Sequence, residues 1–320
     1  MTIRIGFIGC GAIGCTHMEL LSRNDDVQLA AFYDINKPLA ENVARMYNGV
    51  PCESLEDMLD KLDIDAVWIC IPPFAHAGQE IFVAEREIPF FVEKPVSLDL
   101  DLATRTKKAV DKAGILTCVG YHWRYKQSVC MAKIRFGHRT PFMLQGYWPC
   151  EAPDVEWWND VNKSGGQIVE QITHIFDVAR YMIGDIVEIS GFATPAETDK
   201  GEIHKCAVVN MKFDNGAIGT IASSNCMNEE GTPWIKIHFE DEIMHIGSRE
   251  VIFREKGAND EKYTGFDNGM DLEQRIFLDC ITGKRESMEI RSTYLDAVKT
   301  LEVTLAANLA IKTGKPVKLS

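Results

Sequence analysis

Apolar and polar positions follow two different rhythms along the chain, and the rhythm changes near residue 120. Before that point, short apolar runs rich in β-branched and aromatic residues alternate with stretches of helical length. The runs that predict strands cover residues 3–9, 27–34, 66–71, 90–93 and 116–119, and the helical stretches lie around 13–22, 37–46, 55–62, 75–86 and 101–113. Because these strands are apolar on both faces, we expect a parallel sheet with helices on both sides.

After residue 120 the pattern predicts a loop-rich stretch, one long helix over 166–183, and then strands without helices between them. These strands cover 186–192, 204–213, 217–224 and 234–239, and a last helix runs over about 293–313. Asp214-Asn215-Gly216 predicts a hairpin turn, since Asn-Gly accepts the positive φ angles that such turns require. We therefore expect an α/β chain with two domains, residues 1–120 and residues 121–320. The second is expected to be an α+β domain on an open, largely antiparallel sheet.

The composition is that of a globular chain and excludes several classes of function. Of the 320 residues, 46% are hydrophobic, and the net charge of −13 without a basic block argues against nucleic acid or an anionic membrane as partner. The ten cysteines are scattered without a CxxC pair, so we expect buried thiols in a reducing compartment. A strand that begins at Ile3 leaves no room for a signal peptide, and no apolar run approaches the roughly 20 residues of a membrane span. These features predict a cytoplasmic protein.

A glycine-rich motif follows the first predicted strand. Gly9-Cys10-Gly11-Ala12-Ile13-Gly14 fits GxGxxG, precedes a helix, and is followed by Asp34 at the end of the second strand. Glycines there permit a tight turn and close approach of a pyrophosphate, and the helix N-terminus offers unpaired N–H groups to it. The motif therefore predicts a Rossmann domain that binds a dinucleotide through Gly9, Gly11, Ala12, Ile13, Gly14 and Asp34.

Asp34 also bears on the choice of cofactor. A carboxylate at this position accepts hydrogen bonds from the ribose hydroxyls and repels a 2′-phosphate, which favours NAD over NADP. Lys37 lies close enough in sequence to weaken that preference. Two other interpretations of the motif are a glycine-rich turn without a ligand and a methyltransferase that uses a related loop for adenosyl-methionine.

Two further segments carry candidate chemistry. Lys94 ends a predicted strand of the first domain, where it either points toward the nicotinamide crevice or is a surface lysine. In the predicted helix 166–183, at roughly 100° per residue, Glu170, His174, Asp177 and Tyr181 fall within a stripe about 60° wide. The opposite face is apolar, with Ile168, Ile172, Ile175, Ala179 and Ile183.

We expect this polar stripe to be a site, because a solvated helix face is usually rich in Lys and Glu. The competing interpretations are an ordinary solvated face and a lone histidine of the core. A metal held by Glu170 and His174, four residues apart, is a rival functional hypothesis. No further cluster of ligands in the sequence supports it, so we expect no metal.

These segments together resemble the Gfo/Idh/MocA oxidoreductase family, which includes glucose–fructose oxidoreductase and inositol dehydrogenase. The resemblance covers nearly the whole chain, and Glu93-Lys94-Pro95 and the helix with an acid four residues before His174 are its most specific parts. The other matching segments are IGFIGCGAIG near the start, Ile71-Pro-Pro-Phe-Ala-His76 and Gly120-Tyr-His-Trp-Arg124-Tyr. The resemblance implies a Rossmann domain followed by an α/β domain whose open sheet often forms oligomer contacts.

The resemblance also implies roles for single residues. Lys94 matches the family's active-site lysine, His174 its catalytic histidine and Asp177 a substrate-site aspartate. Glu170 stands where the family usually has aspartate, which puts the fine geometry and the identity of the substrate in doubt. The predicted cofactor contacts further include Pro72, His76, Glu93 and Lys94. The predicted substrate contacts are Lys94, Tyr121, Trp123, Arg124, Trp158, Glu170, His174 and Asp177.

These roles imply an NAD-dependent oxidoreductase that exchanges a hydride with a secondary alcohol of a sugar or inositol-type polyol. His174 would be the general base, Lys94 would stabilise alkoxide charge, and Glu170 would orient them. The alternatives are a lyase or hydrolase of glycosides that uses tethered NAD for transient oxidation, and a non-catalytic NAD-binding sensor. We expect a homo-oligomer, a dimer or a tetramer, and no nucleic-acid or membrane partner.

Overall fold

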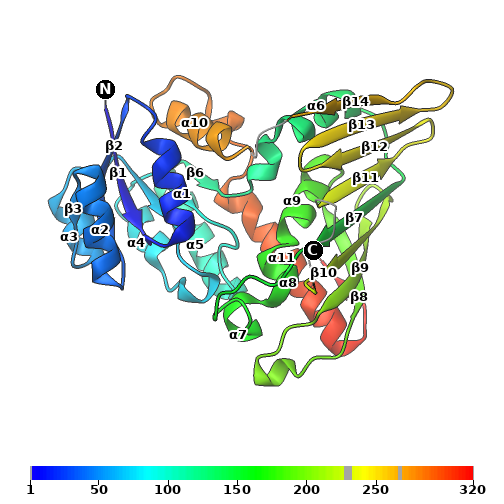
Figure 1. Cartoon of the computed structure of the whole chain (residues 1–320), viewed down its shortest axis with the longest axis horizontal. Helices are drawn as coiled ribbons and strands as arrows, with labels where there is room; N and C mark the ends of the chain where they lie inside the picture. The colour runs from blue at the N-terminus through cyan, green and yellow to red at the C-terminus, as the bar shows by residue number, and fades with distance from the viewer. Residues whose placement is uncertain (1, 227–232, 266–268, 320) are drawn as a thin grey trace. The chain divides into compact units, whose positions relative to one another are not determined.

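The computed structural model describes residues 2–226, 233–265 and 269–319, and the chain divides into two compact units (Figure 1). The first unit comprises Met1–Gly120 and Asp271–Val298. The second comprises Tyr121–Met270 and Lys299–Ser320. The first division of the chain therefore falls after Gly120, but the expectation of one uninterrupted second domain over 121–320 is wrong, because residues 271–298 pack with the first unit.

The first unit is built on a parallel sheet of six strands in the described residues, in the order β3-β2-β1-β4-β5-β6. This order is typical of Rossmann domains, and it confirms the predicted fold. The strands are β1 (Ile3–Ile8), β2 (Val27–Tyr33), β3 (Val50–Pro51), β4 (Ala66–Ile69), β5 (Phe90–Val92) and β6 (Thr117–Val119). All residues of β4, β5 and β6 are buried, as expected for strands covered on both faces.

The helices between these strands follow the predicted positions closely. They are α1 (Ala12–Leu21), α2 (Lys37–Tyr47), α3 (Leu55–Lys61), α4 (Gln79–Ala84) and α5 (Leu100–Ala113). The predicted helix 75–86 begins later than expected, because a short 3-10 turn at Pro73–Ala75 is followed by Gly78 with φ +111°. A residue in that conformation cannot continue a helix, so α4 starts at Gln79.

The segment 271–298 completes the first unit. Its helix α10 (Met270–Ile281) was not predicted. Phe277 of this helix is fully buried and packs edge-on against Trp68 of β4 at 5.5 Å. Tyr294, at the start of α11 (Tyr294–Thr313), packs edge-on against Phe90 of β5. Residues 271–298 therefore cover part of the sheet, although residues 121–270 separate them from the rest of the first unit along the chain.

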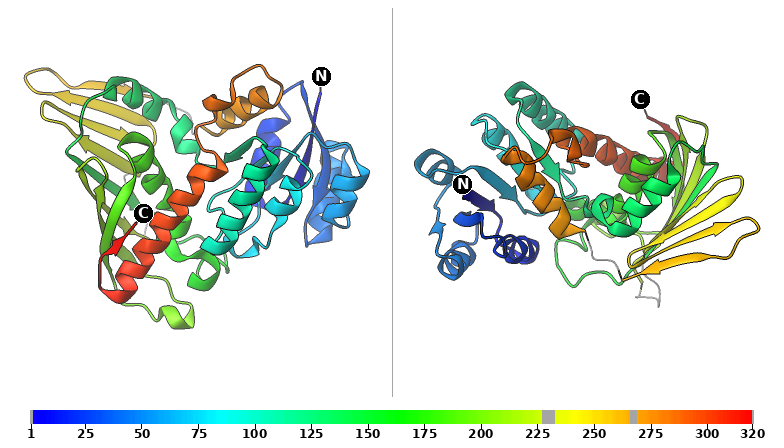
Figure 2. Two further views of the ribbon diagram at one scale, coloured as in Figure 1. Left: turned by 180° about the vertical axis from the view of Figure 1, so that it is seen from behind. Right: turned by 90° about the horizontal axis from the view of Figure 1, so that it is seen from above.

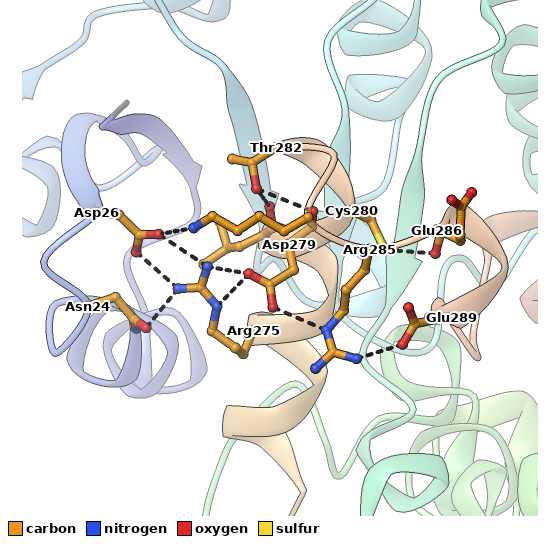
Figure 3. A network of polar contacts seen from close by, with 11 residues as sticks. Asn24, Asp26, Arg275, Asp279, Cys280, Thr282, Arg285, Glu286 and Glu289 are labelled. Carbon is orange, nitrogen blue, oxygen red and sulfur yellow. Dashed lines mark hydrogen bonds and ion pairs between the residues drawn. The ribbon is translucent and has the colours of Figure 1, made fainter.

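A network of charged residues holds α10 against the turn between α1 and β2, which contains Asn24 and Asp26 (Figure 3). The guanidinium of Arg275 binds Asp26 through two N–H groups at 2.9 and 3.1 Å and also donates to Asn24 and Asp279. Lys284 donates to the same Asp26 carboxylate at 2.9 Å. These hydrogen bonds hold the pKa of Asp26 well below its usual range.

The second unit contains a mixed, mostly antiparallel sheet, as expected. Among the described residues it has nine strands in the order β14-β13-β12-β11-β7-β10-β9-β8-β15, and only β7 and β10 are parallel neighbours. The strands are β7 (Met143–Pro149), β8 (Ile186–Ala193), β9 (Cys206–Phe213), β10 (Ile218–Ser224), β11 (Trp234–His238), β12 (Glu242–Gly247), β13 (Glu250–Glu255), β14 (Glu261–Thr264) and β15 (Val317–Lys318). Burial alternates residue by residue in β9 and β11, so one face of the sheet carries the core and the other stays accessible.

Among the described residues, the helices of the second unit lie on one face of this sheet and none lies on the other face (Figures 1 and 2). They are α6 (Gln127–Phe136), α7 (Val161–Ser164), α8 (Gly166–Glu170), α9 (Thr173–Met182) and the second part of α11. The prediction of a loop-rich stretch after residue 120 is wrong, since α6 and β7 lie there. The apolar residues of α6, α9 and α11 form one core with the inner face of the sheet.

The predicted hairpin at 214–216 is present between β9 and β10, but its conformation differs from the expectation. Gly216 has φ +88°, whereas Asn215 does not adopt a positive φ. Asn215 instead donates from its side chain to the carbonyl of Ile183. The amide side chain therefore ties the turn to the end of α9, and one glycine provides the conformational freedom that the turn needs.

Two further expectations concern the whole chain. The ten cysteines are free thiols, of which Cys15 and Cys226 are exposed and the others at least partly buried. In the parts of the chain that the structure describes, no helix has the length and apolar character needed to cross a membrane.

The Asp26–Arg275 pair gives a prediction for stability. Replacing Arg275 by Gln is expected to lower the melting temperature by about 2–4 °C at pH 7, because it leaves Asp26 without its bidentate partner. Since the folded-state pKa of Asp26 is depressed, this contribution is present above the unfolded pKa and is lost as the pH falls from about 5 toward 2. Thermal scans of both proteins across that range measure the difference. Arg105→Gln, on the exposed face of α5, is the control, and a difference that does not shrink at low pH would contradict the account.

Candidate functional site

Three backbone segments meet where β1 turns into α1. Gly9 has φ +96°, and a Cβ there would collide with the carbonyl oxygen of Cys70 at the end of β4. A Cβ on Gly14 would lie 2.5 Å from the carbonyl oxygen of Gly9. Both positions therefore require glycine, the first for the turn and the second for the close packing of helix on strand.

Gly11 differs from these two glycines, because a Cβ there would meet no atom within 4 Å. It is the N-cap residue of α1, and no side chain caps this helix. The first N–H groups of α1, those of Ala12 and Ile13, are therefore left for a ligand. The open space beside Gly11 lets a pyrophosphate approach the backbone. The residues present fit a dinucleotide at this loop.

Asp34 follows β2 and faces the same loop. Its carboxylate accepts hydrogen bonds from the backbone N–H groups of Cys10 at 2.8 Å and Asn36 at 2.7 Å. These bonds fix the carboxylate in the orientation that ribose hydroxyls would meet, while the side chain stays partly exposed. Lys37, the residue that weakened the preference for NAD, forms an ion pair with Glu53.

Two buried thiols near the loop are chemically inert. Burial and the neighbouring Asp34 raise the pKa of the Cys10 thiol to about 12. Burial and the Glu93 carboxylate raise the pKa of Cys70 well above its usual range. Both residues therefore stay protonated at neutral pH and serve as apolar packing beside the cofactor loop.

Lys94 lies directly after β5, at the carboxyl edge of the parallel sheet where ligands of such domains bind. Its side chain is partly exposed, and the Lys94–Pro95 peptide bond is cis. Glu93, predicted as a cofactor contact, is buried. Its carboxylate instead lies 2.8 Å from Nε2 of His17 and accepts the backbone N–H of Lys94 at 3.1 Å.

Pro72 and His76 lie in the loop that follows β4, next to the glycine turn. His76 is buried, and its Nδ1 is hydrogen-bonded to the carboxylate of Glu80 in α4. Pro72 is partly exposed and precedes the short 3-10 turn. The glutamate thus holds the imidazole of His76 in one orientation, which keeps this residue compatible with the predicted cofactor contact.

In the second unit, the predicted helix over 166–183 is broken. α8 ends at Glu170 and α9 begins at Thr173, because the N–H of Ile172 reaches back five residues to Gln167 and the N–H of His174 reaches back three to Gln171. The angular stripe derived for one continuous helix therefore does not hold across the break. The predicted division of this helix into one apolar and one polar face is also wrong, since nearly every residue of α9 is buried.

His174 is surrounded by aromatic rings. Trp148 of β7 stacks on its imidazole at 5.7 Å with an interplanar angle of 12°. The rings of His122 and Tyr121 meet it edge-on at 4.7 and 6.1 Å. Gly146 lets α9 approach the sheet this closely, since a Cβ there would lie 2.8 Å from the side chain of Ile175. The imidazole is therefore held in a fixed plane beside a second imidazole.

Asp177 and Arg124, both predicted as substrate contacts, bind each other instead. The guanidinium donates two hydrogen bonds to the carboxylate at 2.7 and 2.6 Å, and Thr300 donates a third at 3.2 Å. Asp177 is fully buried and Arg124 is 4% exposed. This pair joins the 3-10 turn before α6 to α9 and α11, so in this structure it positions α9 rather than presenting a surface to a substrate.

Three other predicted substrate residues are buried as well. Trp158 is 1% exposed and donates its indole N–H to Glu170 at 2.7 Å, which leaves Glu170 as the partly exposed member of that pair. Trp123 packs against Trp148, and Tyr121 shares a hydrogen bond with Thr173. Of the predicted substrate contacts, Lys94 and Glu170 retain partial exposure.

The rival hypothesis of a metal depended on Glu170 and His174 lying on one helix face. The break at Gln171 removes that relation, and Glu170 is bonded to Trp158. Across 2–226, 233–265 and 269–319, no group of three or more His, Cys, Asp or Glu side chains has the geometry to hold a metal ion.

Sequence reasoning missed His17 and His122. His17 stood in an otherwise apolar helix face, which is the one sign that it has a buried partner. His122 gave no such sign, because its contact with His174 joins segments 52 positions apart in the chain. Trp148 stands out in the sequence as an aromatic residue before the helix of His174, but its stacking on His174 joins segments 26 positions apart. Those contacts depend on tertiary packing.

The strand order, the glycine loop and Asp34 together define the class of this protein as a dinucleotide-binding Rossmann protein. Residues 3–121 match the model of an oxidoreductase family with an NAD-binding Rossmann fold, and residues 129–245 match the GFO/IDH/MocA C-terminal domain. The chain belongs to the GFO/IDH/MocA family of oxidoreductases with an NAD-binding Rossmann fold.

Several relatives span the chain. It is 27% identical over 340 residues to a scyllo-inositol 2-dehydrogenase (NAD(+)) of Bacillus subtilis, with 99% of this chain and 96% of the relative aligned. It is 30% identical over 231 residues to a myo-inositol 2-dehydrogenase of Thermotoga maritima, with 69% and 68% aligned. Among solved structures, the WlbA dehydrogenase of Bordetella pertussis in complex with NADH and UDP-GlcNAcA has a TM-score of 0.86 at 20% identity, covering 100% of this chain and 98% of that one. This last likeness shows the fold.

The buried Arg124–Asp177 pair leads to a prediction. Asp177→Asn removes the carboxylate that binds the buried guanidinium, so we expect a loss of about 3–5 kcal/mol in the free energy of unfolding. The double variant Arg124→Met/Asp177→Leu removes both charges and should recover most of that loss. Urea unfolding of the three proteins measures it. An Asp177→Asn protein with wild-type stability and a raised KM would instead restore Asp177 as a substrate contact.

Proposed function

We propose that this protein is an NAD-dependent dehydrogenase that moves a hydride between a secondary alcohol of a sugar or inositol-type polyol and nicotinamide. The observation that carries the proposal lies in the first unit. Lys94, a partly exposed cation, follows β5 on the same carboxyl edge of the parallel sheet as the glycine loop after β1. A polar cation at that edge is placed where a cofactor in this loop would present its reactive end.

Each candidate residue then has a chemical task. When bound, NAD accepts the hydride from the carbinol carbon. His174 takes the hydroxyl proton, since a neutral imidazole is a proton acceptor and its ring is fixed by stacking on Trp148 and by the edge-on contact with His122. Lys94 donates a hydrogen bond from Nζ to the same oxygen and stabilises its developing negative charge. Reduction of a ketone uses the same groups in reverse.

Glu170 is proposed to orient the substrate hydroxyls. Its side chain is fixed by the hydrogen bond from Trp158 yet remains partly exposed. Carboxylate oxygens accept hydrogen bonds, and hydroxyl groups of a polyol are donors of that kind. Arg124 and Asp177 support this reaction indirectly, by fixing the helix that carries His174.

The substrate class rests on the relatives. The two inositol dehydrogenases align with most of this chain, and the WlbA structure shares the fold while binding a nucleotide sugar. Each of these substrates is a ring with several secondary hydroxyl groups. The common chemistry is therefore oxidation of a ring carbinol, and we propose that class without assigning one sugar.

We also propose that the protein forms a homo-oligomer through the helix-free face of its second sheet. That face exposes the apolar side chains of Phe192 in β8, Val208 in β9 and Ile218 in β10, and Phe192 and Val208 are paired across neighbouring strands. Apolar groups gathered on an open sheet face are typical of a contact surface. Light scattering should give a multiple of the single-chain mass, and the mass of one chain would contradict this proposal.

The activity assay follows NADH absorbance at mildly alkaline pH with a panel of inositols, aldoses and glycosides. We expect one or more polyols to give NADH. His174→Ala should lower kcat by about 100- to 10,000-fold as a lost general base, and Lys94→Ala by about 100- to 1,000-fold as a lost alkoxide donor. Both variants should bind NAD like the wild type.

His138→Ala and Lys108→Ala are matched controls, since both side chains are exposed and lie outside the candidate site. They should retain activity. If no substrate yields NADH while the protein turns over glycosides with cofactor retained, the redox-assisted lyase becomes the better account. Binding of NAD without any turnover would favour the sensor.

A further inference from the structure

A histidine and a glutamate form a buried pair inside the first unit, and neither has a task in the reaction proposed above. His17 of α1 is 0% exposed, and its Nε2 lies 2.8 Å from Oε1 of Glu93. The imidazole also packs against the ring of Phe91 in β5 at 5.0 Å. The pair therefore joins the middle of α1 to the end of β5.

The surroundings leave little freedom to Glu93. A Cβ on Gly120, after β6, would lie 2.7–2.9 Å from the three atoms of the Glu93 carboxyl group. The backbone N–H of Glu93 is bonded to Ile69 of β4, and the N–H of Gly120 is bonded to Val92. The carboxylate is thus enclosed between neighbouring strands and α1.

The second oxygen of the same carboxylate holds the backbone of Lys94. The N–H of Lys94 donates to Oε2 of Glu93 at 3.1 Å. One carboxylate therefore has a hydrogen bond to α1 through one oxygen and a hydrogen bond to the Lys94 peptide through the other. A bidentate arrangement of this kind fixes direction as well as distance.

The histidine is not the residue that stability alone would select. Its Nδ1 is buried and has no hydrogen-bond partner among the described residues. A buried, unsatisfied nitrogen costs free energy that an apolar side chain of the same volume would not. The bond from Nε2 to Glu93 is therefore the polar interaction that accounts for an imidazole in this position.

The position of His17 on α1 gives this bond a consequence. The same helix begins at Ala12, five residues before His17, and its first residues through Gly14 belong to the glycine motif. A helix turn is rigid over this distance. The helix that receives the dinucleotide phosphates is thus connected through one imidazole and one carboxylate to the peptide of Lys94.

We propose that His17 is a positioning residue, which through Glu93 holds Lys94 in register with the cofactor bound at the start of α1. Glu93 is then a positioning residue too, in place of the cofactor contact expected for it. The catalytic consequence rests on the proposed function of Lys94, whereas the mechanical part, that His17 fixes the Lys94 peptide, does not.

The first test measures the mechanical part without turnover. In protein labelled with ¹⁵N-lysine, the amide of Lys94 is expected to exchange with solvent slowly in the wild type. His17→Leu keeps the volume and removes the Nε2–H donor, so exchange at Lys94 should be at least about tenfold faster. His17→Gln retains an N–H donor and should restore most of the protection.

Met18→Ala is the matched control, because Met18 is the next residue of α1, is 0% exposed and belongs to the apolar core. It weakens the packing of the helix without touching the Glu93 bond. We expect it to speed exchange over the whole unit rather than at Lys94 in particular. Equal effects of His17→Leu and Met18→Ala at Lys94 would overturn the proposal.

The second test uses the polyol that the activity assay identifies. His17→Leu should lower kcat by about tenfold or more while the Kd for NAD stays within about threefold, and His17→Gln should recover most of kcat. Met18→Ala should keep kcat at temperatures where it is folded. A His17→Leu protein that loses NAD binding instead of kcat, or a His17→Gln protein as slow as His17→Leu, would overturn the positioning role.

The two tests separate two failures. If exchange at Lys94 responds to His17 as described but Lys94→Ala leaves turnover unchanged, the proposed role of Lys94 is wrong and the connection itself stands. If Lys94→Ala abolishes turnover while exchange at Lys94 ignores His17, the proposed function stands and the positioning role is wrong.

Discussion

The close approach of three backbone segments at Gly9, Gly14 and Cys70 is the constraint on which the first unit depends. No Cβ fits at Gly9 or Gly14, so β1, α1 and the end of β4 meet at the distance of bare backbone. That contact fixes the direction in which α1 leaves the sheet. The free N–H groups at its start and the buried His17 in its middle are both consequences of this direction. The cofactor loop, Glu93 and Lys94 are therefore all positioned by the same backbone contact of β1, α1 and β4.

The second unit solves a different problem, that of holding an imidazole in place. α9 is buried nearly all round, so its polar side chains cannot be solvated and must find partners. Asp177 finds Arg124 and Thr300, and His174 lies among Trp148, His122 and Tyr121. Buried polar groups of this kind add orientation more than stability. α9 therefore holds the imidazole of His174 in one orientation, and the burial of several charged side chains around it costs free energy of folding.

Much of the first unit could be predicted from the sequence because its signals are local. Strand–helix alternation predicted the sheet, and the spacing of Gly9, Gly11, Gly14 and Asp34 predicted the cofactor loop, since these residues lie close together in sequence or end neighbouring strands. The segment 271–298 could not be placed, because its attachment depends on Arg275 meeting Asp26 from the far end of the chain. The roles of Lys94, His174 and Glu170 stay predictions that rest on residue type and position.

The wrong prediction of one continuous helix over 166–183 has a physical origin. Helical periodicity assumes an unbroken helix, and the N–H of Ile172 reaching back to Gln167 breaks it. Aromatic residues such as Trp158 and Trp123 are recognisable in sequence, but only packing decides whether they face a pocket or the core.

The central claim is that a hydride moves between nicotinamide and a ring carbon of the substrate. The most direct measurement supplies NADH with deuterium at the transferable position and a set of keto-polyols, and locates the label by mass spectrometry and NMR. The account predicts deuterium at the new carbinol carbon of the product with the wild type, and labelling at least about 100-fold slower with His174→Ala. Tight binding of the labelled cofactor with all deuterium retained in it, across the whole set of ketones, would contradict the account.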